Sequence, residues 1–520
     1  MRDFNINGLC MPNDHYMVDL SQRVREIAET LVEKGKYFTI NRARQYGKTT
    51  TLNSLAQLLS NKYIVIRLSF EGRDEYFSSP QTLALGVSLD IAGRLRKVDE
   101  KLAAVFRTPI DPELPLRDLG YKIQTACEQA SKGLILLIDE VDKASDNQIF
   151  IAFLGLLRDL YLERNQGTGE SFKSVILAGV YDVKNLKLKI RPDEKHTYNS
   201  PWNIAAPFYL DMSFSADEIA GMLGEYEEDY HTGMSIQDVA EHIRWYTDGY
   251  PFLVSLLCKH IHDAAKGWTI DDVDVAARRV LVEKNTLFDD MIKNLVNHPK
   301  FSNLVERIVL EGKSVTYNPD DPSLDLGIIY GIFSHNDGKI RIANQIFSTR
   351  LMNYYISISE TSKLAETRSY DELTQFIKGG VLDFDKILER FTVFMRDEYR
   401  DSDSKFLERE ARRLLLGFIK PIINGTGNYF LEPEIRGGQK IDILVLYRGQ
   451  EYIIEVKIWR GKAYENSGVD QLARYARARH REKGYLVSFC DQAKAPREGR
   501  VFNHNGIEIH EVIVAYKDVV

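Results

Sequence analysis

Short apolar runs alternate with longer segments of helical periodicity over the first part of the chain. The runs are too short for helices and fit strands, whereas apolar residues recur at helical spacing between them. Strands that alternate with helices indicate a parallel sheet covered by helices. We therefore expect an α/β core over residues 1–212, with strands at 37–40, 64–70, 134–138, 174–179 and 208–212 and helices at 81–97, 116–130 and 147–164.

After this core the pattern changes to helices joined by short loops. We expect a helical lid at residues 213–283, followed at 284–357 by two helices and a hairpin with an Asn-Asp-Gly turn. Helices followed by a hairpin indicate a winged helix, which either contacts DNA or packs as a lid on the core. The hairpin carries only Lys339 and Arg341 as cations, which favours the packing role.

The last part of the chain has an order of elements of its own. Residues 358–402 are polar and are expected to form a helical connector. The remainder follows the order helix, three strands, helix, strand, which predicts a mixed sheet. We therefore expect a second α/β domain at 403–520, with helices at 405–422 and 469–483 and strands at 429–436, 440–447, 451–459 and 485–489.

Composition and length are those of a soluble globular protein. The chain has 520 residues, enough for about three domains, with 44% hydrophobic and 28% charged residues. Its apolar runs are too short to cross a bilayer, and its first residues lack the pattern of a secretory signal. We therefore expect a cytoplasmic protein with no membrane partner. The four cysteines lie far apart and are expected to be reduced thiols: Cys10, Cys127, Cys258 and Cys490.

Charge is unevenly distributed along the chain. The net charge is −7, which argues against indiscriminate nucleic-acid binding by the whole molecule. Residues 211–229 hold seven acidic side chains and no Lys or Arg, whereas residues 455–500 hold eleven Lys and Arg against six Asp and Glu. A polyanion is therefore expected to prefer the C-terminal region.

The first expected strand ends in a loop that contains Gly47-Lys48-Thr49 and opens a helix. The three residues match the second half of the pattern G-x-x-x-x-G-K-[ST], in which backbone N–H groups hold phosphate. We assign Lys48 to the β- and γ-phosphates and the Thr49 hydroxyl to magnesium. Gly47 and Thr50 complete the expected cofactor-binding set. Arg42 stands where the pattern has its first glycine, so an ordinary basic helix start is the alternative.

A second motif follows the apolar run at 134–138, where Asp139 and Glu140 come directly after it. The run fits a central parallel strand that delivers two carboxylates at its C-terminal edge. There Asp139 can hold magnesium, and Glu140 can orient the attacking water as a catalytic residue. Asp182 follows the fourth expected strand and either senses the γ-phosphate or forms a turn. The two motifs together favour a site for ATP and Mg²⁺.

Several short motifs resemble those of the AAA-like ATPases in the bacterial and archaeal signal-transducing group: RARQYGKTT, LLIDEVD, LLRDLY, AGVYDV, TDGYPF and IANQIF. The resemblance covers residues 1–357. It implies a five-stranded P-loop core, a helical lid and a winged helix, with Lys48 and Thr49 on the nucleotide and Asp139 and Glu140 on magnesium and water. Related proteins also open this loop with arginines, so Arg42 weakens the general motif more than this match.

Three polar residues interrupt apolar strands in the C-terminal domain. If Arg448 and Gly449 form the turn, positions that sum to 897 face each other, and Asp442 lies opposite Glu455. If the turn is one residue later, Asp442 faces Lys457 instead. In either case the three side chains share one face.

Facing carboxylates repel each other unless something positive lies between them. A divalent metal held by Asp442 and Glu455 meets this need, and Lys457 is then available to activate water or to stabilise charge on a scissile phosphate. The alternative is a solvated hairpin face with mixed charges. The flanking residues are fully apolar, which argues against that alternative.

The pattern D-x12-E-x-K resembles the PD-(D/E)XK nuclease superfamily over residues 403–520, a restriction-endonuclease-like α/β fold. The resemblance implies that Asp442, Glu455 and Lys457 are catalytic. It also implies that Gln471, with Tyr475, belongs to the Gln-x-x-x-Tyr feature of the next helix. Glu410 or Glu408 on the first helix matches the additional metal ligand of many members. The expected nucleic-acid face is the basic helix that carries Arg474, Arg477 and Arg481.

Our leading hypothesis from the sequence is an ATP-regulated, magnesium-dependent DNA nuclease, of a kind compatible with defence or mobile-element biology. The alternative is a nucleotide-dependent switch that signals or binds DNA through its winged helix, with a catalytically silent nuclease-like fold. A decayed nuclease is expected to have lost one of its three central residues, and this chain retains all of them. The sequence allows a homo-oligomer but does not require one.

Overall fold

The computed structural model describes the chain as two compact units. One unit comprises residues 1–244, 249–269 and 328–331, and the other comprises residues 245–248, 270–327 and 332–520. The structure describes residues 2–517, apart from 145–147, 181–200, 265–266, 312–314, 337, 364–375, 379–380, 399–407, 424–426, 432–433, 436–438, 460–461 and 492–497.

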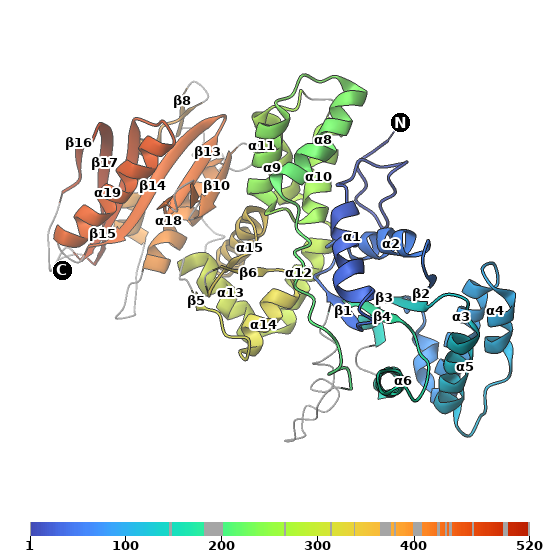
Figure 1. The fold of residues 1–520 in the computed structure, drawn as a ribbon. Helices are drawn as coiled ribbons and strands as arrows, with labels where there is room; N and C mark the ends of the chain where they lie inside the picture. The colour runs from blue at the N-terminus through green and yellow to red at the C-terminus, as the bar shows by residue number, and fades with distance from the viewer. Residues whose placement is uncertain are drawn as a thin grey trace. The chain divides into compact units, whose positions relative to one another are not determined.

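A four-stranded parallel sheet forms the centre of the first unit (Figure 1). Its order is β1-β4-β3-β2, so the strand before the phosphate loop lies beside the fourth strand. The third strand lies between two neighbours and is almost fully buried, as its continuous apolar run predicts. The strands are β1 (Phe38–Asn41), β2 (Ile64–Ser69), β3 (Leu134–Asp139) and β4 (Ser174–Gly179).

The expected strand at 208–212 is wrong. Beside β1 the structure has only an isolated parallel bridge between Phe38 and Ala206, made by the Ala206 N–H and the Tyr37 carbonyl at 2.8 Å. The following backbone is bonded by a side chain, because the Arg42 guanidinium donates to the Leu210 carbonyl at 2.6 Å. The described sheet therefore has four strands and a bridge at its edge.

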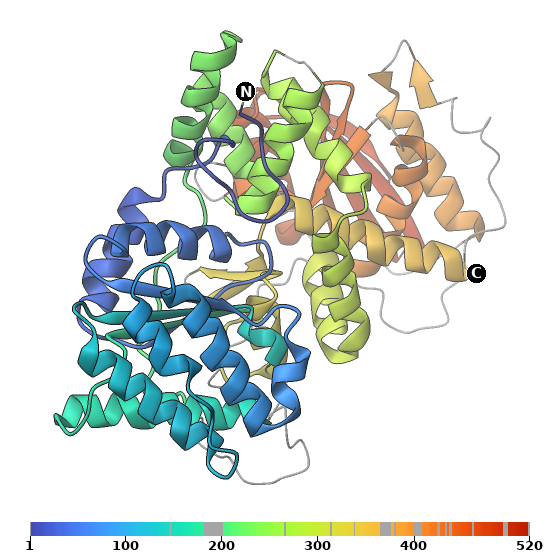
Figure 2. The same ribbon diagram turned by 90° about the vertical axis from the view of Figure 1, so that its right-hand side faces the viewer.

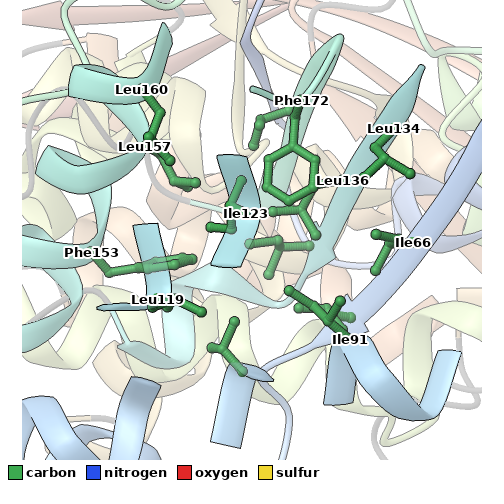
Figure 3. Packing of buried hydrophobic residues seen from close by; sticks show 14 of the residues in the cluster. Ile66, Ile91, Leu119, Ile123, Leu134, Leu136, Phe153, Leu157, Leu160 and Phe172 are labelled. Atoms are coloured by element: carbon green, nitrogen blue, oxygen red, sulfur yellow. The ribbon is translucent and has the colours of Figure 1, made fainter. Parts of the chain in front are cut away.

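Helices cover both faces of this sheet. On one face, alternate residues of the strands pack against α3 (Pro80–Leu95), α5 (Pro115–Gln129) and α6 (Gln148–Gln166). These three helices lie within a few residues of the ranges that the sequence predicts. The opposite face receives α2 (Lys48–Leu59), which packs against α1 (Ser21–Ile27). Figure 3 shows the hydrophobic core on the face covered by α3, α5 and α6, where strand and helix side chains point toward one another. The labelled residues are Ile66, Leu134, Leu136, Ile91, Leu119, Ile123, Phe153, Leu157, Leu160 and Phe172.

A group of helices follows the sheet, as expected for residues 213–283. They are α8 (Ala216–Tyr230), α9 (Ile236–Thr247), α10 (Pro251–Asp263) and α11 (Ile270–Val282). The N-terminal segment runs beside α8 and α10 (Figure 2), where Phe4 packs on Tyr226 and Asp3 pairs with Lys259 at 3.0 Å. The loop before α10 depends on Gly249, whose φ is +70° and whose added Cβ would lie 2.1 Å from the Phe214 carbonyl oxygen.

The second unit begins with helices around a small antiparallel sheet of order β5-β7-β6. The predicted hairpin is confirmed by the pairing of β6 and β7. Arg341, one of its two cations, donates to Asp248 at 3.2 Å. The elements are α12 (Thr286–Asn297), α13 (Pro299–Glu311), β5 (Val315–Thr316), α14 (Pro322–Ile329), β6 (Phe333–Asn336), β7 (Lys339–Ile342) and α15 (Gln345–Lys363).

The C-terminal part of this unit contains a mixed six-stranded sheet of order β10-β13-β14-β15-β17-β16 (Figure 1). The pairs β14 with β15 and β15 with β17 are parallel, and the other pairs are antiparallel. The elements are α17 (Phe384–Glu398), α18 (Glu408–Ile423), β10 (Gly427–Leu431), β13 (Ile443–Tyr447), β14 (Gln450–Ile458), α19 (Lys462–Ala478), β15 (Lys483–Asp491), β16 (Arg500–His504) and β17 (Ile507–Lys517), with short pairs β8 (Ile377–Lys378) and β9 (Val381–Leu382), and β11 (Glu434–Ile435) and β12 (Gln439–Lys440).

Two predictions for this sheet need correction. The helix expected at 469–483 begins earlier and ends at Ala478, because His480 adopts a left-handed conformation with φ +54° that stops the helix. The strand expected at 429–436 is split between β10 and β11. The last two strands, β16 and β17, were not expected.

Opposite faces of the sheet are covered by different helices. Phe384 and Phe391 of α17 contact Tyr485 and Phe489 of β15 on one face. On the other face Gly468 of α19 lies against the side chain of Lys457. A Cβ added to Gly468 would be in tight contact, 3.2 Å from Lys457 Cγ and Cε. This packing places α19 over the strand that carries two of the expected catalytic residues.

Candidate functional site

The loop between β1 and α2 has the backbone of a phosphate-binding loop. Gly47 begins the helix with φ +78°, and Gln45 is also left-handed with φ +55°. Arg42 is not among the described residues with positive φ, and its N–H donates to the Gly179 carbonyl at 3.2 Å. The position of the missing first glycine therefore needs no glycine here, which explains why arginine is tolerated.

Lys48 is buried at the start of α2, within the loop itself. Its Nζ donates to the carbonyls of Arg42 and Ala43, both at 2.9 Å. Burial lowers the pKa of Lys48, and the carboxylates of Asp142 and Glu140 oppose that shift. The ammonium is therefore held by two loop carbonyls, with acidic residues nearby.

The two sequence motifs meet in the structure. The Thr49 hydroxyl donates to Asp139 Oδ2 at 2.7 Å, and the other oxygen of Asp139 accepts the Glu140 N–H at 2.9 Å. Glu140 has a left-handed backbone with φ +56°. Burial raises the pKa of the Glu140 carboxyl, and the charges of Asp142 and Asp139 add to this shift. The predicted magnesium residues Thr49 and Asp139 are thus in direct contact.

Asp142 is a residue that sequence reasoning missed, although it lies in the LLIDEVD motif. Its Oδ1 accepts the Val180 N–H at 3.2 Å, and an added Cβ on Gly179 would lie 2.9 Å from the same oxygen. The carboxylate therefore joins the ends of β3 and β4 beside Lys48. Asp182, the expected sensor or turn residue, lies outside the described residues.

Residues far along the chain hold the phosphate loop in place. The Tyr250 hydroxyl donates to the Arg44 carbonyl, and its ring packs edge-on against Tyr46 with centroids 4.6 Å apart. Gly331 also packs closely against the phosphate loop, because a Cβ added to it would lie 2.7 Å from Ala43 Cβ. The signal for Tyr250 was present in the TDGYPF motif. Thr50 faces the N-terminal segment, since its hydroxyl accepts the Cys10 N–H at 3.4 Å.

The register of the C-terminal hairpin is settled by its turn. Ile443 pairs with Ile454 and Tyr447 pairs with Gln450, so facing positions sum to 897. Arg448 and Gly449 are both left-handed, with φ +48° and +76°, as a two-residue hairpin turn requires. The first of the two predicted registers is therefore correct, and the register that faces Asp442 with Lys457 is wrong.

Asp442, Glu455 and Lys457 come together as a cluster in which both carboxylates are buried and the lysine is half-buried. Glu455 is 0% exposed and Asp442 is 4% exposed. The Asp442 N–H donates to Glu455 Oε2 at 3.3 Å, and Lys457 Nζ lies 2.7 Å from Glu455 Oε1. Asp442 Oδ2 accepts the Val456 N–H at 2.8 Å. The solvated hairpin face considered from the sequence is thus not what forms.

Arg412 is the residue of this cluster that the sequence did not reveal. Its Nη2 donates to Asp442 Oδ1 at 2.6 Å, and the two side chains are only 7% and 6% exposed. Arg412 belongs to α18, the helix expected to supply an acidic ligand. The side chains of Glu408 and Glu410 lie outside the described part of the structure, so the expected extra ligand stays a prediction.

The electrostatics of the cluster favour a cation. Burial, and after it the charge of Asp442, raise the pKa of Glu455 to about 8, although Lys457 opposes the shift. In the described residues no group of three or more His, Cys, Asp or Glu is arranged to hold a metal ion. Two carboxylates still fit Mg²⁺, which proteins commonly bind through one or two carboxylates together with water and substrate phosphate.

The helix α19 carries the predicted residues Gln471 and Tyr475, and its Gly468 packs against the Lys457 side chain. Gly468 touches Lys457, and Gln471 follows at helical spacing on the same side. Gln471 is half-buried. Tyr475, one further turn along, is buried, and burial raises the pKa of its hydroxyl to about 12. The supporting role of Gln471 stays a prediction.

The expected nucleic-acid face on α19 is only partly available. Arg474 and Arg477 are exposed, and Arg477 donates to the Asn505 carbonyl at 2.6 Å. Arg481 is bound by Glu451 at 3.1 Å, together with Arg479. Part of the positive charge predicted for this helix is therefore neutralised within the protein.

Two further expectations concern membranes and thiols. Over the described residues, no helix combines the length and the apolar character needed to span a bilayer. All four cysteines are free thiols, and Cys258 and Cys490 are buried.

Comparison with solved structures returned distant likenesses. A Walker-type ATPase, PABY2304 of Pyrococcus abyssi, has a TM-score of 0.44 at 13% identity, covering 67% of this chain and 99% of that chain. The Aeropyrum pernix ORC2 protein in ADPNP-ADP complexes has a TM-score of 0.40 at 12% identity, covering 69% and 97%. The Aeropyrum pernix ORC1 protein in complex with DNA has a TM-score of 0.29 at 12% identity, covering 66% and 94%. These scores are too low to support an inference about function.

Comparison with families is more informative. A search of curated proteins returned no match. The AAA-like domain family matches residues 7–349, a span that contains the phosphate loop, the Asp139-Glu140 motif and the helices that follow. Family match and loop geometry agree on a P-loop nucleotide site. The chain therefore belongs to the AAA-like domain family and is a P-loop ATPase with an additional C-terminal α/β sheet.

Proposed function

We propose that the protein is an ATP-regulated, magnesium-dependent DNA nuclease. Its core at 1–212, lid at 213–283 and winged-helix-like part at 284–357 form the ATPase, and a connector at 358–402 joins them to the nuclease at 403–520. The observation that carries the nuclease is the cluster of Asp442, Glu455 and Lys457, because charged groups in these positions cost more to bury than apolar residues would.

Burial of such a cluster is costly. Removing carboxylates from water is unfavourable unless they are fully paired, and well-packed apolar residues in their place are often as stable or more stable. Here Glu455 is fully buried beside a second carboxylate, with apolar residues on every flank. Titratable groups perturbed in this way concentrate at functional sites. Catalysis is the role that best accounts for retaining them.

The residues of the nucleotide site have separate roles. Lys48 neutralises phosphate, and the Thr49 hydroxyl and Asp139 hold the cation, a role that the 2.7 Å contact between them supports. Glu140 orients the attacking water. Its raised pKa follows from burial among carboxylates, and a bound cation together with Lys48 favours its ionised form. Magnesium supplies charge neutralisation for the transferred phosphoryl group.

In the nuclease site the chain supplies two acidic groups and a cation. Asp442 and Glu455 form the donor pair for the metal, which would polarise the scissile phosphate and activate water. Lys457 lies beside this pair and stabilises the negative charge that develops during cleavage. Gln471 helps to position the substrate or water from α19. Arg474 and Arg477 offer exposed positive charge for the nucleic-acid backbone.

The test is a cleavage assay on the full chain with DNA and Mg²⁺. We expect Glu455→Gln to abolish cleavage and Lys457→Ala to reduce it strongly while metal binding is kept. Glu389→Gln, an exposed carboxylate of α17, is the matched control and should cleave at the wild-type rate. Equal cleavage by wild type and Glu455→Gln would refute the assignment.

A second function has one observation in its favour. Both carboxylates already have cationic partners, Arg412 and Lys457, so the cluster is also compatible with a silent nuclease-like fold that serves a nucleotide-dependent switch. In that case the full chain would bind ATP but would cleave neither DNA nor RNA with Mg²⁺. The same assay therefore separates the two functions.

A further inference from the structure

We propose that Arg412 is a charge switch that couples metal binding to substrate binding. Arg412 occupies Asp442 when no divalent cation is bound, and it moves to the scissile phosphate when a cation takes Asp442. This inference rests on the nuclease function proposed above and adds to it a phosphate-binding residue that also controls access of the metal.

The first observation is that donors surround both carboxylates. Arg412 holds Asp442 Oδ1, and the Val456 N–H holds Oδ2. Lys457 lies on Glu455 Oε1, and the Asp442 N–H holds Oε2. All four oxygens therefore have a positive or N–H neighbour. A divalent cation that binds this pair must displace or repel at least one of them.

The second observation identifies which donor can move. Two of the four are backbone N–H groups fixed at the end of the β13-β14 hairpin. The Lys457 stem is confined by α19, because Gly468 leaves space for it and an added Cβ there would already lie 3.2 Å from Cγ and Cε. Arg412 is a long side chain that reaches the site from a separate element, α18. It is therefore the donor best able to leave.

Charge balance gives the movement a direction. A divalent cation binds the pair with both carboxylates ionised, and the charges of Arg412 and Lys457 then already balance the charges of Asp442 and Glu455. A divalent cation adds positive charge to a buried site, and the guanidinium 2.6 Å from Asp442 would lie beside it. Buried like charges repel strongly at short distance. An incoming phosphodiester removes part of this excess and offers Arg412 a new partner.

Arginine is well suited to both partners. Its planar guanidinium binds carboxylate and phosphate with the same fork of N–H donors, so it can exchange one for the other without change of protonation. The competing explanation is a permanent ion pair that only fixes α18 to the sheet. Removing Arg412 frees Asp442 for a metal under either explanation. The two explanations differ in the coupling, because only a residue that moves to the phosphate makes DNA and Mn²⁺ strengthen each other's binding through Arg412.

The experiment measures the affinity of the full chain for Mn²⁺, by calorimetry without nucleotide. The heat assigned to this site is the part that Asp442→Asn removes. We expect Arg412→Met to bind Mn²⁺ at this site at least about tenfold more tightly than wild type, because a buried like charge is gone. Arg390→Met, an exposed arginine of α17, is the matched control and should equal wild type.

A second measurement tests the coupling in wild type and then in Arg412→Met. For wild type, a short DNA duplex with phosphorothioate linkages should tighten Mn²⁺ binding, because it draws Arg412 away from Asp442. By linkage, Mn²⁺ should tighten DNA binding by the same factor. Arg412→Met should show little of this coupling and should cleave DNA poorly.

The outcomes separate the two proposals. Asp442-dependent Mn²⁺ binding that is equal or weaker in Arg412→Met, or that DNA does not tighten in wild type, would overturn the switch and leave the nuclease in place. Absence of any Asp442-dependent Mn²⁺ binding, with or without DNA, would overturn the nuclease site itself. Tighter binding in Arg412→Met with lost coupling supports both.

Discussion

Replacement of Gly249 by alanine tests how the phosphate loop is supported. Gly249 has φ +70°, and an added Cβ would lie 2.1 Å from the Phe214 carbonyl oxygen and 2.6 Å from the Phe214 nitrogen. Gly233 is the matched control, since it has φ +76° but nothing within 4 Å of an added Cβ. The pair therefore separates the cost of the left-handed backbone from the cost of the collision.

The magnitudes follow from these two costs. A left-handed alanine costs about 1–2 kcal/mol, which is the full effect expected for Gly233→Ala. Gly249→Ala adds overpacking of about 1–3 kcal/mol and the loss of a backbone hydrogen bond worth about 1 kcal/mol. That bond runs from the Phe214 N–H to the Gly249 carbonyl at 2.8 Å. We expect a total of about 3–6 kcal/mol.

The assay is urea unfolding of both variants and wild type, followed by far-UV circular dichroism, with ATP affinity measured by calorimetry. Displacement of Gly249 shifts Tyr250, whose hydroxyl holds the Arg44 carbonyl. ATP affinity should therefore fall about fivefold or more in Gly249→Ala, the value of one hydrogen bond, and stay unchanged in Gly233→Ala. Equal stability and equal ATP affinity of the two variants would refute the reasoning.

Three further predictions concern the two sites. Gly468→Ala should press on the Lys457 stem and slow DNA cleavage several-fold, while calorimetry shows Mn²⁺ binding unchanged. The pKa of Glu455 is raised to about 8 in the folded state, so the folded protein holds this proton more tightly than the unfolded chain. Without metal, the contribution of Glu455 to the free energy of unfolding should therefore fall as pH rises from about 4.5 to about 8. Denaturation at several pH values checks this, and the loss should be absent in Glu455→Gln. Lys48→Ala should lose ATP binding, whereas Glu140→Gln should bind ATP and hydrolyse it slowly, as calorimetry and phosphate release will show.

The local part of both sites could be predicted from the sequence. The sequence leaves two hairpin registers open, but both put Asp442, Glu455 and Lys457 on one face. The structure has the register that brings Asp442 opposite Glu455. Likewise, in a parallel sheet the strand that carries Asp139 ends at the same edge as the strand before the Thr49 loop, and the side chains of Thr49 and Asp139 are in contact. These contacts depend on periodicity and short turns, which a sequence displays directly.

The remaining contacts depend on how distant elements pack, and the sequence does not display that. Arg412 is one of several charged residues on an amphipathic helix, and only the placement of α18 against the sheet singles it out. The segment 208–212 has the composition of a strand, but the Arg42 guanidinium, and not a neighbouring strand, hydrogen-bonds the Leu210 carbonyl. Tyr250 was part of a recognised motif, yet its hydrogen bond to the phosphate loop required the fold.

The most direct test of the account compares DNA cleavage by wild type, Asp442→Asn and Lys48→Ala in Mg²⁺, each with and without ATP. The account predicts that wild type cleaves and that ATP changes its rate. Asp442→Asn should not cleave under either condition, and Lys48→Ala should cleave at a rate that ATP does not change. Cleavage by Asp442→Asn at the wild-type rate would contradict the account.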